Sequence, residues 1–383
     1  MNPAWPSPLE EQLLLACFAP EEAARAALDR CSRELAGTEC GPAAMALLPL
    51  VYRRWPEVQN NVVHVGKGAY FTTWNRNREG MAELAGIAAR FGEEGIRWMA
   101  LKGAALAVWQ YRDLGLRPMT DVDVLVRPAD LERAIGVLSL TGYRAENGAT
   151  SDAIVRQARV RHACQFFRGQ DSNFDLHWRP VSRCYSPEVT RSFWEGAETV
   201  CFGGHSMLVP SASDQLFHVC VHGLQWDWTR KIRWIADALT ILREPMDWER
   251  IRQLAEWAQM SFRLADALEL LRERFGAPVP PDMSERLIRA AAGWERHECR
   301  LLLKPCPLGV YDSIAWHAYH FRRIRPFDDR WRRLSLAIAC QQYLLAFLDA
   351  PSLRFLWLKL RPHLLLRLQR ITRRGSVGSG AHL

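Results

Sequence analysis

Two aspartates, Asp121 and Asp123, lie two residues apart in the otherwise apolar stretch 120–126. In a β-strand successive side chains point to opposite faces, so both carboxylates lie on one face and Val122 and Val124 on the other. Adjacent carboxylates repel each other unless a positive charge lies between them, and Mg²⁺ is commonly held by one or two carboxylates together with substrate phosphates. The pair therefore predicts a magnesium site, with phosphoryl or nucleotidyl transfer as the first hypothesis.

Lys102 and Gly103 precede this pair and follow a short apolar stretch, so we predict that they form a strand-to-helix turn. A glycine there lets the backbone approach a phosphate, the helix offers unpaired N–H groups, and Lys102 adds a positive charge. The alternative interpretation is a simple surface turn. Arg117 is predicted either to neutralise a phosphate or to pair with Asp121.

Asp175 and His177 share one face of a second apolar stretch at 173–178. A third carboxylate on a neighbouring strand would complete a clamp for two metal ions, one activating the attacking hydroxyl and the other holding a triphosphate. Asp175 is also the natural candidate for a general base. His162 is predicted either to face the same cleft or to be a partly buried strand histidine.

His218 and His222 are four residues apart on a predicted helix and therefore project from one face. Such a pair can bind zinc, but the hydrolase motif H-E-x-x-H requires a glutamate where this chain has Val219. We therefore predict hydrogen bonds at a domain contact, with metal binding or His222 lining a nucleotide cleft as alternatives. Arg233 and Asp237 have the same spacing, which predicts a helical ion pair first and a cleft-lining role second.

The composition is that of an ordinary globular protein of two or three domains, with 383 residues of which 49% are apolar and 24% charged. Ten cysteines without a C-x-x-C pair predict free thiols in a reducing cytosol and not a disulfide or zinc framework. No basic region precedes the short apolar run at 13–19, which argues against a secretory signal. We therefore expect a cytoplasmic protein.

The formal net charge of +8 is concentrated near the C-terminal end. Residues 351–374 hold seven lysines and arginines and no acidic residue, and subtracting these seven from +8 leaves +1 for the rest. This distribution argues against nucleic acid as the main partner. The basic amphipathic tail is predicted either to pack on its own protein or to contact an anionic membrane surface, a partner protein or RNA, and 375–383 to be disordered.

The periodicity of the apolar residues divides the chain into four parts. We predict a helical N-terminal region at 1–94, an α+β core at 95–210, a helical domain at 211–350, and the tail at 351–383. Within the core we predict strands at 96–101, 122–126, 143–145, 159–167 and 173–178, helices at 104–111 and between 131 and 142, and a β pair flanking 203–204.

As a set, these motifs resemble the uncharacterised bacterial nucleotidyltransferase family of the DNA polymerase β-like nucleotidyltransferase superfamily. The resemblance covers about residues 95–275. The motifs that carry it are Leu101-Lys102-Gly103, Tyr111-Arg112-Asp113, the run from Arg117 to Asp123, Gly142-Tyr143, the run from Asp175 to Trp178, His218, His222 and Arg233-x-x-x-Asp237.

The resemblance implies an α+β fold with a small mixed β-sheet, and Asp121, Asp123 and Asp175 as metal ligands. It also implies a transferase dependent on Mg²⁺, or alternatively Mn²⁺, that moves a nucleoside monophosphate from ATP or another NTP to a hydroxyl. Superfamily members usually have Gly-Ser where this chain has Lys102-Gly103. Lys102 therefore either supplies the phosphate contact or marks altered donor use or lost catalysis.

The acceptor is left open, and a small molecule, a peptide and a protein all remain candidates. Members of the family often accompany biosynthetic gene clusters for modified peptides or surface polysaccharides. Two alternatives come from other functional classes. One is a non-catalytic nucleotide- or partner-binding module of a biosynthetic complex, and the other is a metal-dependent hydrolase that uses His218 and His222.

Overall fold

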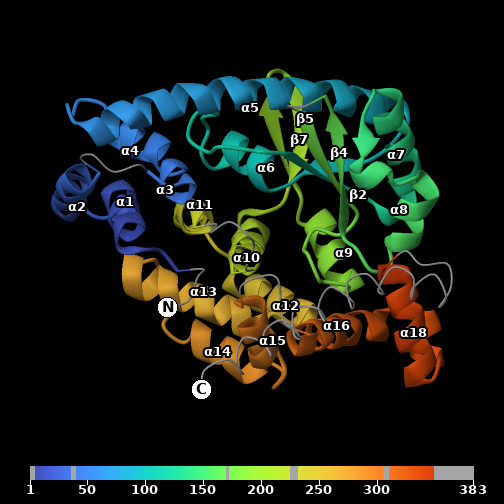
Figure 1. Ribbon diagram of the computed structural model, residues 1–383. Helices are drawn as coiled ribbons and strands as arrows, with labels where there is room; N and C mark the ends of the chain where they lie inside the picture. Colours follow the sequence, from blue (N-terminus) through green and yellow to red (C-terminus); the bar gives the residue numbers. More distant parts are fainter. Residues whose placement is uncertain (1–4, 36–39, 170–171, 225–231, 305–309, 349–383) are drawn as a thin grey trace, which may run out of the picture.

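The computed structural model shows an α+β fold with a small mixed sheet between helical layers (Figure 1). Within the part of the chain that it describes, no helix is long and apolar enough to span a membrane. The predicted basic tail at 351–383 lies outside the described residues. These are 5–35, 40–169, 172–224, 232–304 and 310–348.

Two of the N-terminal helices begin at recognisable capping residues. Ser7 and Glu10 form a reciprocal capping box at the start of the first helix, and Asn60 accepts a hydrogen bond from the Val63 N–H at the start of the longest. The longest helix, α5, runs across the sheet and is the upper layer of Figure 1. The five helices are α1 Pro8–Phe18, α2 Glu21–Glu34, α3 Pro42–Met45, α4 Leu48–Arg54 and α5 Asn61–Glu93.

The central sheet has five strands in the order β1-β2-β5-β4-β3. β2 and β5 pair in parallel, and the other three pairings are antiparallel. The parallel pair brings together two strands that are far apart in the chain. The strands are β1 Trp98–Ala100, β2 Val122–Val126, β3 Arg144–Ala145, β4 Ala163–Arg168 and β5 Ser172–His177.

Short helices connect the first four of these strands. The first of them follows β1 directly, so that its N-terminus lies at the end of that strand. The connecting elements are α6 Lys102–Trp109, the 3₁₀ turn η1 Pro128–Asp130, α7 Leu131–Leu140, the 3₁₀ turn η2 Glu146–Gly148 and α8 Ser151–Gln157.

The two faces of the sheet have different roles. Val122, Val124 and Val126 join Phe174 and Leu176 in a hydrophobic core that α5 and α7 cover. The intervening residues of β2 and β5 carry the carboxylates on the opposite face, as the alternation of strand side chains requires. One face of the sheet therefore packs in the hydrophobic core, and the other face carries the carboxylates.

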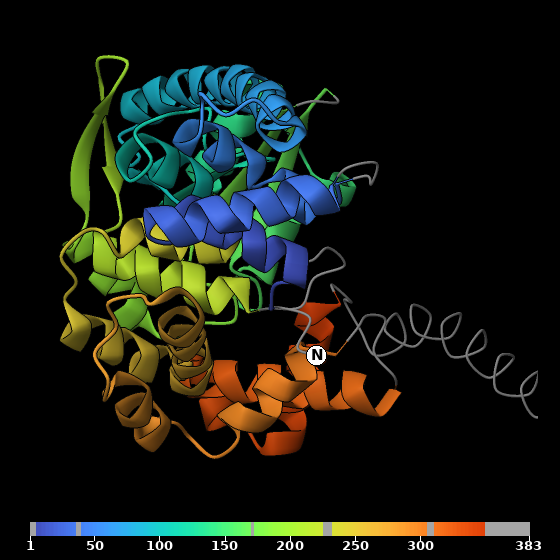
Figure 2. The same cartoon turned by 90° about the vertical axis from the view of Figure 1, so that its left-hand side faces the viewer.

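A two-stranded hairpin and the helical C-terminal half complete the molecule. Figure 2 shows the hairpin along one side, and Figure 1 shows the helices from α10 onward on the side of the sheet opposite α5. The elements are α9 Pro187–Glu195, β6 Glu198–Phe202, β7 His205–Val209, α10 Ala212–Gly223, α11 Arg233–Ile241, α12 Trp248–Ala258, α13 Ser261–Phe275, α14 Met283–Ala290, α15 Glu295–Leu302, α16 Val310–Ile324, η3 Arg325–Phe327, α17 Asp329–Arg333 and α18 Leu336–Phe347.

The N-terminal helices share a hydrophobic core with this C-terminal half. Leu13 and Leu48 belong to the same buried cluster as Leu216 and Leu264. The chain therefore returns from the sheet to pack against its own beginning.

The predicted α+β class is confirmed, and the predicted strand at 122–126 has the observed bounds. The strand predicted at 159–167 begins later, because Val160 and Arg161 both donate backbone hydrogen bonds to the Gln157 carbonyl and continue the turn after α8. Helices α8 and α9 were not predicted.

A buried carboxylate ties α15 to α16 and to the segment before α9. The side chain of Glu298 is fully buried, and its Oε1 accepts hydrogen bonds from Arg183 Nη2 at 2.7 Å and Arg323 Nε at 2.8 Å. Burial alone would raise the pKa of Glu298, but the charges of the two arginines outweigh burial and hold the pKa below its ordinary value.

We expect Glu298→Gln to lower the free energy of unfolding by about 3–5 kcal/mol, because it leaves the buried guanidinium groups of Arg183, Arg263 and Arg323 without their counter-charge. Urea unfolding at pH 7 measures the change. Glu285→Gln is the matched control, since Glu285 lies in an exposed pair with Arg289 and should cost less than about 1 kcal/mol. Equal losses in the two variants would contradict the prediction.

The lowered pKa of Glu298 also predicts a pH dependence. A carboxyl whose pKa is depressed by folding stabilises the protein fully above its unfolded pKa, and the contribution is lost as the pH falls toward the folded value. The difference in unfolding free energy between wild type and Glu298→Gln should therefore shrink below about pH 4, near the ordinary glutamate pKa.

Candidate functional site

The parallel pairing of β2 with β5 places Asp123 beside Asp175. These two residues are register partners across the two strands, so their side chains leave the sheet on the same face. Asp123 is 2% exposed, and the side chain of Asp175 is 13% exposed. The sequence predicted a third carboxylate on a neighbouring strand, and the structure places Asp175 there.

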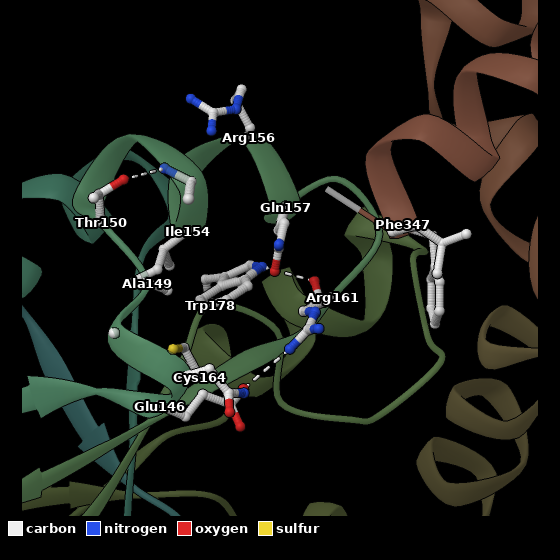
Figure 3. A pocket seen from close by; sticks show the side chains of 14 residues that line it. Glu146, Ala149, Thr150, Ile154, Arg156, Gln157, Arg161, Cys164, Trp178 and Phe347 are labelled. Atoms are coloured by element: carbon white, nitrogen blue, oxygen red, sulfur yellow. Dashed lines mark hydrogen bonds and ion pairs between the residues drawn. The ribbon is translucent and has the colours of Figure 1, made fainter. Parts of the chain in front are cut away.

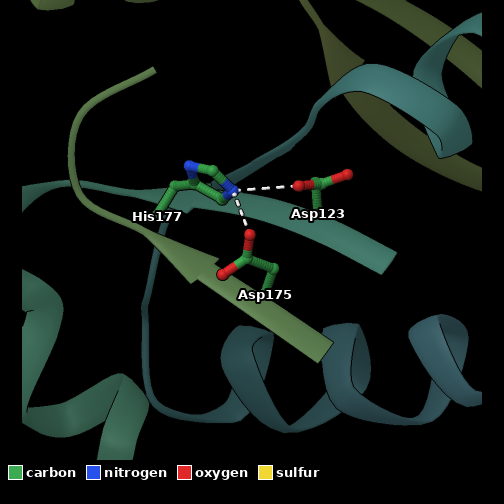
Figure 4. Close-up of side chains that lie close together, drawn as sticks. All are labelled: Asp123, Asp175 and His177. Carbon is green, nitrogen blue, oxygen red and sulfur yellow. Dashed lines mark hydrogen bonds and ion pairs between the residues drawn. The ribbon is translucent and has the colours of Figure 1, made fainter. Parts of the chain in front are cut away.

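His177 joins the two carboxylates (Figure 4). Its Nε2 lies 2.9 Å from Asp123 Oδ1 and 3.1 Å from Asp175 Oδ2, and the ring is fully buried. Burial lowers the pKa of His177, but the Asp175 charge and the hydrogen bonds to both carboxylates outweigh burial and raise that pKa to about 9. In this arrangement Nε2 carries a proton and donates to both aspartates.

Lys102 brings a second positive charge to the same pair. Its Nζ lies 2.6 Å from Asp123 Oδ1 and 4.0 Å from Asp175 Oδ2. Burial favours the neutral form of both aspartates, yet Lys102 and His177 hold the pKa of Asp123 well below its usual range. The pKa of Asp175 is also lowered, because the His177 charge and hydrogen bond outweigh burial.

Asp121 lies beside this cluster, immediately before β2. Its side chain is partly buried, and its Oδ1 accepts a hydrogen bond from Thr120 Oγ1 at 3.2 Å. Burial and the neighbouring Asp123 charge raise the pKa of Asp121. The group of ligand atoms close enough to share one metal ion comprises Asp123, Asp175 and His177, without Asp121.

The turn from β1 into α6 packs closely around Gly103. No described side chain caps the N-terminus of α6, and the Leu101 N–H instead bonds to the Asp123 carbonyl at 3.0 Å. Gly103 is buried there, and a Cβ on it would lie 2.6 Å from Arg117 Nη1 and 2.8 Å from Met119 side-chain atoms. The first N–H groups of α6 thus lack a side-chain cap among the described residues, and a helix N-terminus of this kind favours an anion.

Arg117 is fixed by Asp237 and not by Asp121. Arg117 Nη2 lies 2.9 Å from Asp237 Oδ2, and Nε lies 3.0 Å from Oδ1. The Tyr111 hydroxyl donates to the same Oδ1 at 2.9 Å. This pair leaves Arg117 Nη1 without a hydrogen-bond partner among the described residues, next to Gly103.

The predicted helical ion pair between Arg233 and Asp237 is corrected by this geometry. Asp237 turns to the buried Arg117, and Arg233 Nη1 donates to the Pro118 carbonyl at 2.7 Å. Arg117 is 6% exposed, and leaving a buried guanidinium without its counter-charge is strongly destabilising, which favours its pairing with Asp237. Tyr111 belongs to this network and was missed as a functional residue, although its position in the Tyr-Arg-Asp motif was the available signal.

Three further histidines were predicted as candidate site residues, namely His162, His218 and His222. The His162 ring lies 5.4 Å from that of His177, and burial holds the pKa of His162 well below its usual value. The rings of His218 and His222 lie 6.1 Å apart. Burial, with the charges of Lys102 and His177, lowers the pKa of His218 to about 3. Within the described residues, neither His218 nor His222 belongs to a group of three metal-ligating side chains.

Two cavities flank the sheet. One of about 510 Å³ is lined by Asp121, Thr120 and Asn77 and opens beside the start of β2. The other, of about 690 Å³, is lined by Cys164 and Trp178 (Figure 3). Those two side chains belong to the hydrophobic core of the face opposite the carboxylates, so the second cavity is separate from the cluster.

The donor set of the cluster fits a divalent cation. Carboxylate oxygens suit Mg²⁺ and Mn²⁺, whereas an imidazole nitrogen suits transition metals such as Zn²⁺ and Fe²⁺. The three ligand atoms lie within 4.8 Å of one another. Octahedral Mg²⁺ with bonds of about 2.1 Å places adjacent ligand atoms roughly 3 Å apart, which matches the separations between His177 Nε2 and the two carboxylates.

A family model described as "Uncharacterised nucleotidyltransferase" matches residues 43–276. The matched segment contains the whole central sheet and the helices that carry His218 and Asp237. Because it covers more than half of the chain, the protein belongs to this nucleotidyltransferase family. No curated protein matches the chain.

Gly103→Ala should lower the free energy of unfolding by about 1–3 kcal/mol, because the new methyl group overlaps Arg117 and Met119 in a packed interior. Gly136→Ala in α7 is the matched control, since a Cβ there meets nothing within 4 Å and alanine is favoured over glycine in a helix. Chemical denaturation measures both. A Gly103→Ala variant as stable as wild type would show that Arg117 and Met119 move aside without cost.

Proposed function

We propose that the protein is a divalent-metal-dependent nucleotidyltransferase that moves a nucleoside monophosphate from an NTP to a hydroxyl group of an acceptor. The observation that carries the proposal is the buried cluster of Asp123, Asp175 and His177 next to the uncapped N-terminus of α6. A metal-ligand set and an anion site side by side are what a nucleoside triphosphate requires. Membership of the nucleotidyltransferase family and the α+β fold agree with this function, as they do with the DNA polymerase β-like superfamily.

We assign the triphosphate to the turn between β1 and α6. No described side chain caps the N-terminus of α6, and the helix dipole there favours a negative charge. Arg117 Nη1 adds a donor at Gly103, and its orientation is set by Asp237. A guanidinium held rigidly by a carboxylate loses little conformational entropy when it binds a phosphate oxygen.

The carboxylates supply the metal ligands and the base. Asp123, Asp175 and His177 would hold the cation, with Asp121 beside them. When bound, Mg²⁺ or Mn²⁺ polarises the phosphoryl oxygens and acidifies the acceptor hydroxyl. Asp175 takes the hydroxyl proton, the acceptor oxygen forms a bond to the α-phosphorus, and the bond from that phosphorus to the pyrophosphate oxygen breaks.

The acceptor in this proposal is a hydroxyl of a small molecule, a peptide or a protein, in a biosynthetic pathway. We also propose a cytoplasmic location, which is supported by the nine described cysteines, all of them free thiols.

The full-length protein should release pyrophosphate from at least one NTP in the presence of Mg²⁺ or Mn²⁺ and a set of hydroxyl acceptors. Asp123→Asn and Asp175→Asn should each lower the rate on the order of 10²–10³-fold, the usual loss when one group that stabilises transition-state charge is removed. α-Labelled NTPs identify the product, and a pyrophosphate assay gives the rate.

Asp152→Asn is the matched control, because Asp152 is an exposed aspartate on α8. Its rate should equal that of wild type. Pyrophosphate release that is indifferent to Asp123→Asn and Asp175→Asn would contradict the proposal. Tight NTP binding without turnover across the acceptors would instead favour the non-catalytic module.

A further inference from the structure

Lys102 adopts a backbone conformation that lysine normally avoids. Its φ of 40° lies in the left-handed region, at the first residue of α6. A side chain with a Cβ is strained there, whereas glycine adopts this region freely. Strained residues of this kind persist where their surroundings fix them, and they cluster at functional sites. The side chain of Lys102 is therefore the feature to explain.

The ammonium group of Lys102 lies between the two carboxylates of the metal cluster. It contacts Asp123 Oδ1 at 2.6 Å and faces Asp175 Oδ2 at 4.0 Å. Its side chain is 17% exposed, so water screens these charges only weakly. The same Asp123 oxygen also contacts His177 Nε2 from another direction. Lys102 thus occupies a position that a bridging cation would otherwise take.

The charges of the site indicate how many metal ions it needs. Asp121, Asp123 and Asp175 carry three negative charges, and Lys102 carries one positive charge. A histidine that ligates a metal is neutral at the ligating nitrogen. In the absence of nucleotide, one divalent cation therefore balances the site, whereas a second would leave an uncompensated double positive charge in a buried environment.

We propose that Lys102 takes the place of the second divalent cation, so that the protein holds one metal ion per chain and uses the ammonium group for the other charge. The inference concerns the metal content of the site and rests on the proposed function only for its catalytic meaning. Lys102 is covalently part of the chain, and its ammonium group is held by Asp123. Unlike a bound metal ion, this positive charge cannot dissociate into solvent. The positive charge that a second ion would give the triphosphate then comes from Arg117 and the α6 N-terminus.

Titration of the full-length protein with Mn²⁺, with the free ion followed by electron paramagnetic resonance, tests this proposal directly. Wild type should bind one Mn²⁺ per chain, and Lys102→Gly should bind two. Glycine accepts a φ of 40° without strain, so this variant retains the turn. Lys102→Met, which keeps the length of the side chain and removes its charge, should also bind two.

Arg112→Gly is the matched control. Arg112 also has a positive φ, of 53°, but its side chain is 72% exposed and pairs at 4.0 Å with Glu244, outside the cluster. Removing it takes away one positive charge and relieves the same kind of backbone strain, so it should leave the stoichiometry at one. Asp123→Asn should abolish the binding that wild type shows.

Two Mn²⁺ or none in wild type would overturn the inference, and so would a single Mn²⁺ in both Lys102→Gly and Lys102→Met. Circular dichroism and urea unfolding identify any variant that fails to fold, and the conclusion then comes from the other Lys102 variant. The stoichiometry is independent of the pyrophosphate assay. A chain that binds one Mn²⁺ but transfers no nucleotide would refute the proposed function and support the inference of one metal ion. An active chain that binds two Mn²⁺ would support the proposed function and refute that inference.

Discussion

The buried ion cluster of Asp123, Asp175, Lys102 and His177 is the interaction on which the rest of the structure depends. Two carboxylates on neighbouring strands repel each other in a poorly screened interior, and each tends to take up a proton. The ammonium and imidazole groups remove this penalty, because each lies near both carboxylates. The β1–α6 turn must therefore stay against β2, and β5 must stay paired with β2.

The rest of the fold separates this cluster from the hydrophobic core. Valines alternate with Asp123 along β2, so the core under α5 and the charged face arise from the same five residues. On the charged face, the Arg117–Asp237 pair ties the segment before β2 to α11 in the helical half. That pair holds the Arg117 guanidinium next to Gly103, where its Nη1 has no hydrogen-bond partner among the described residues. A single arrangement of strands thus positions the carboxylates, the N-terminus of α6 and the connection between the two halves of the molecule.

Much of this was predictable from local sequence patterns, and the exceptions have physical causes. Strand alternation predicted that Asp175 and His177 share one face, and the Lys-Gly pair marked the turn before α6. Helical spacing suggested that Asp237 pairs with Arg233, but Asp237 pairs with Arg117, a buried residue 120 positions away in the chain. Helix α8 was missed because its seven residues are too few to establish a periodicity.

The sequence by itself determined the chemical groups and the face of each strand from which they project. It also determined the α+β class, because apolar periodicity is a local property of the chain. Only the tertiary structure decided which groups meet. The parallel register of β2 with β5 put His177 beside Asp123 and Asp175, and the position of α6 put the Lys102 ammonium between the carboxylates. Long-range pairing and burial set those contacts, and neither can be read from the spacing of residues along one chain.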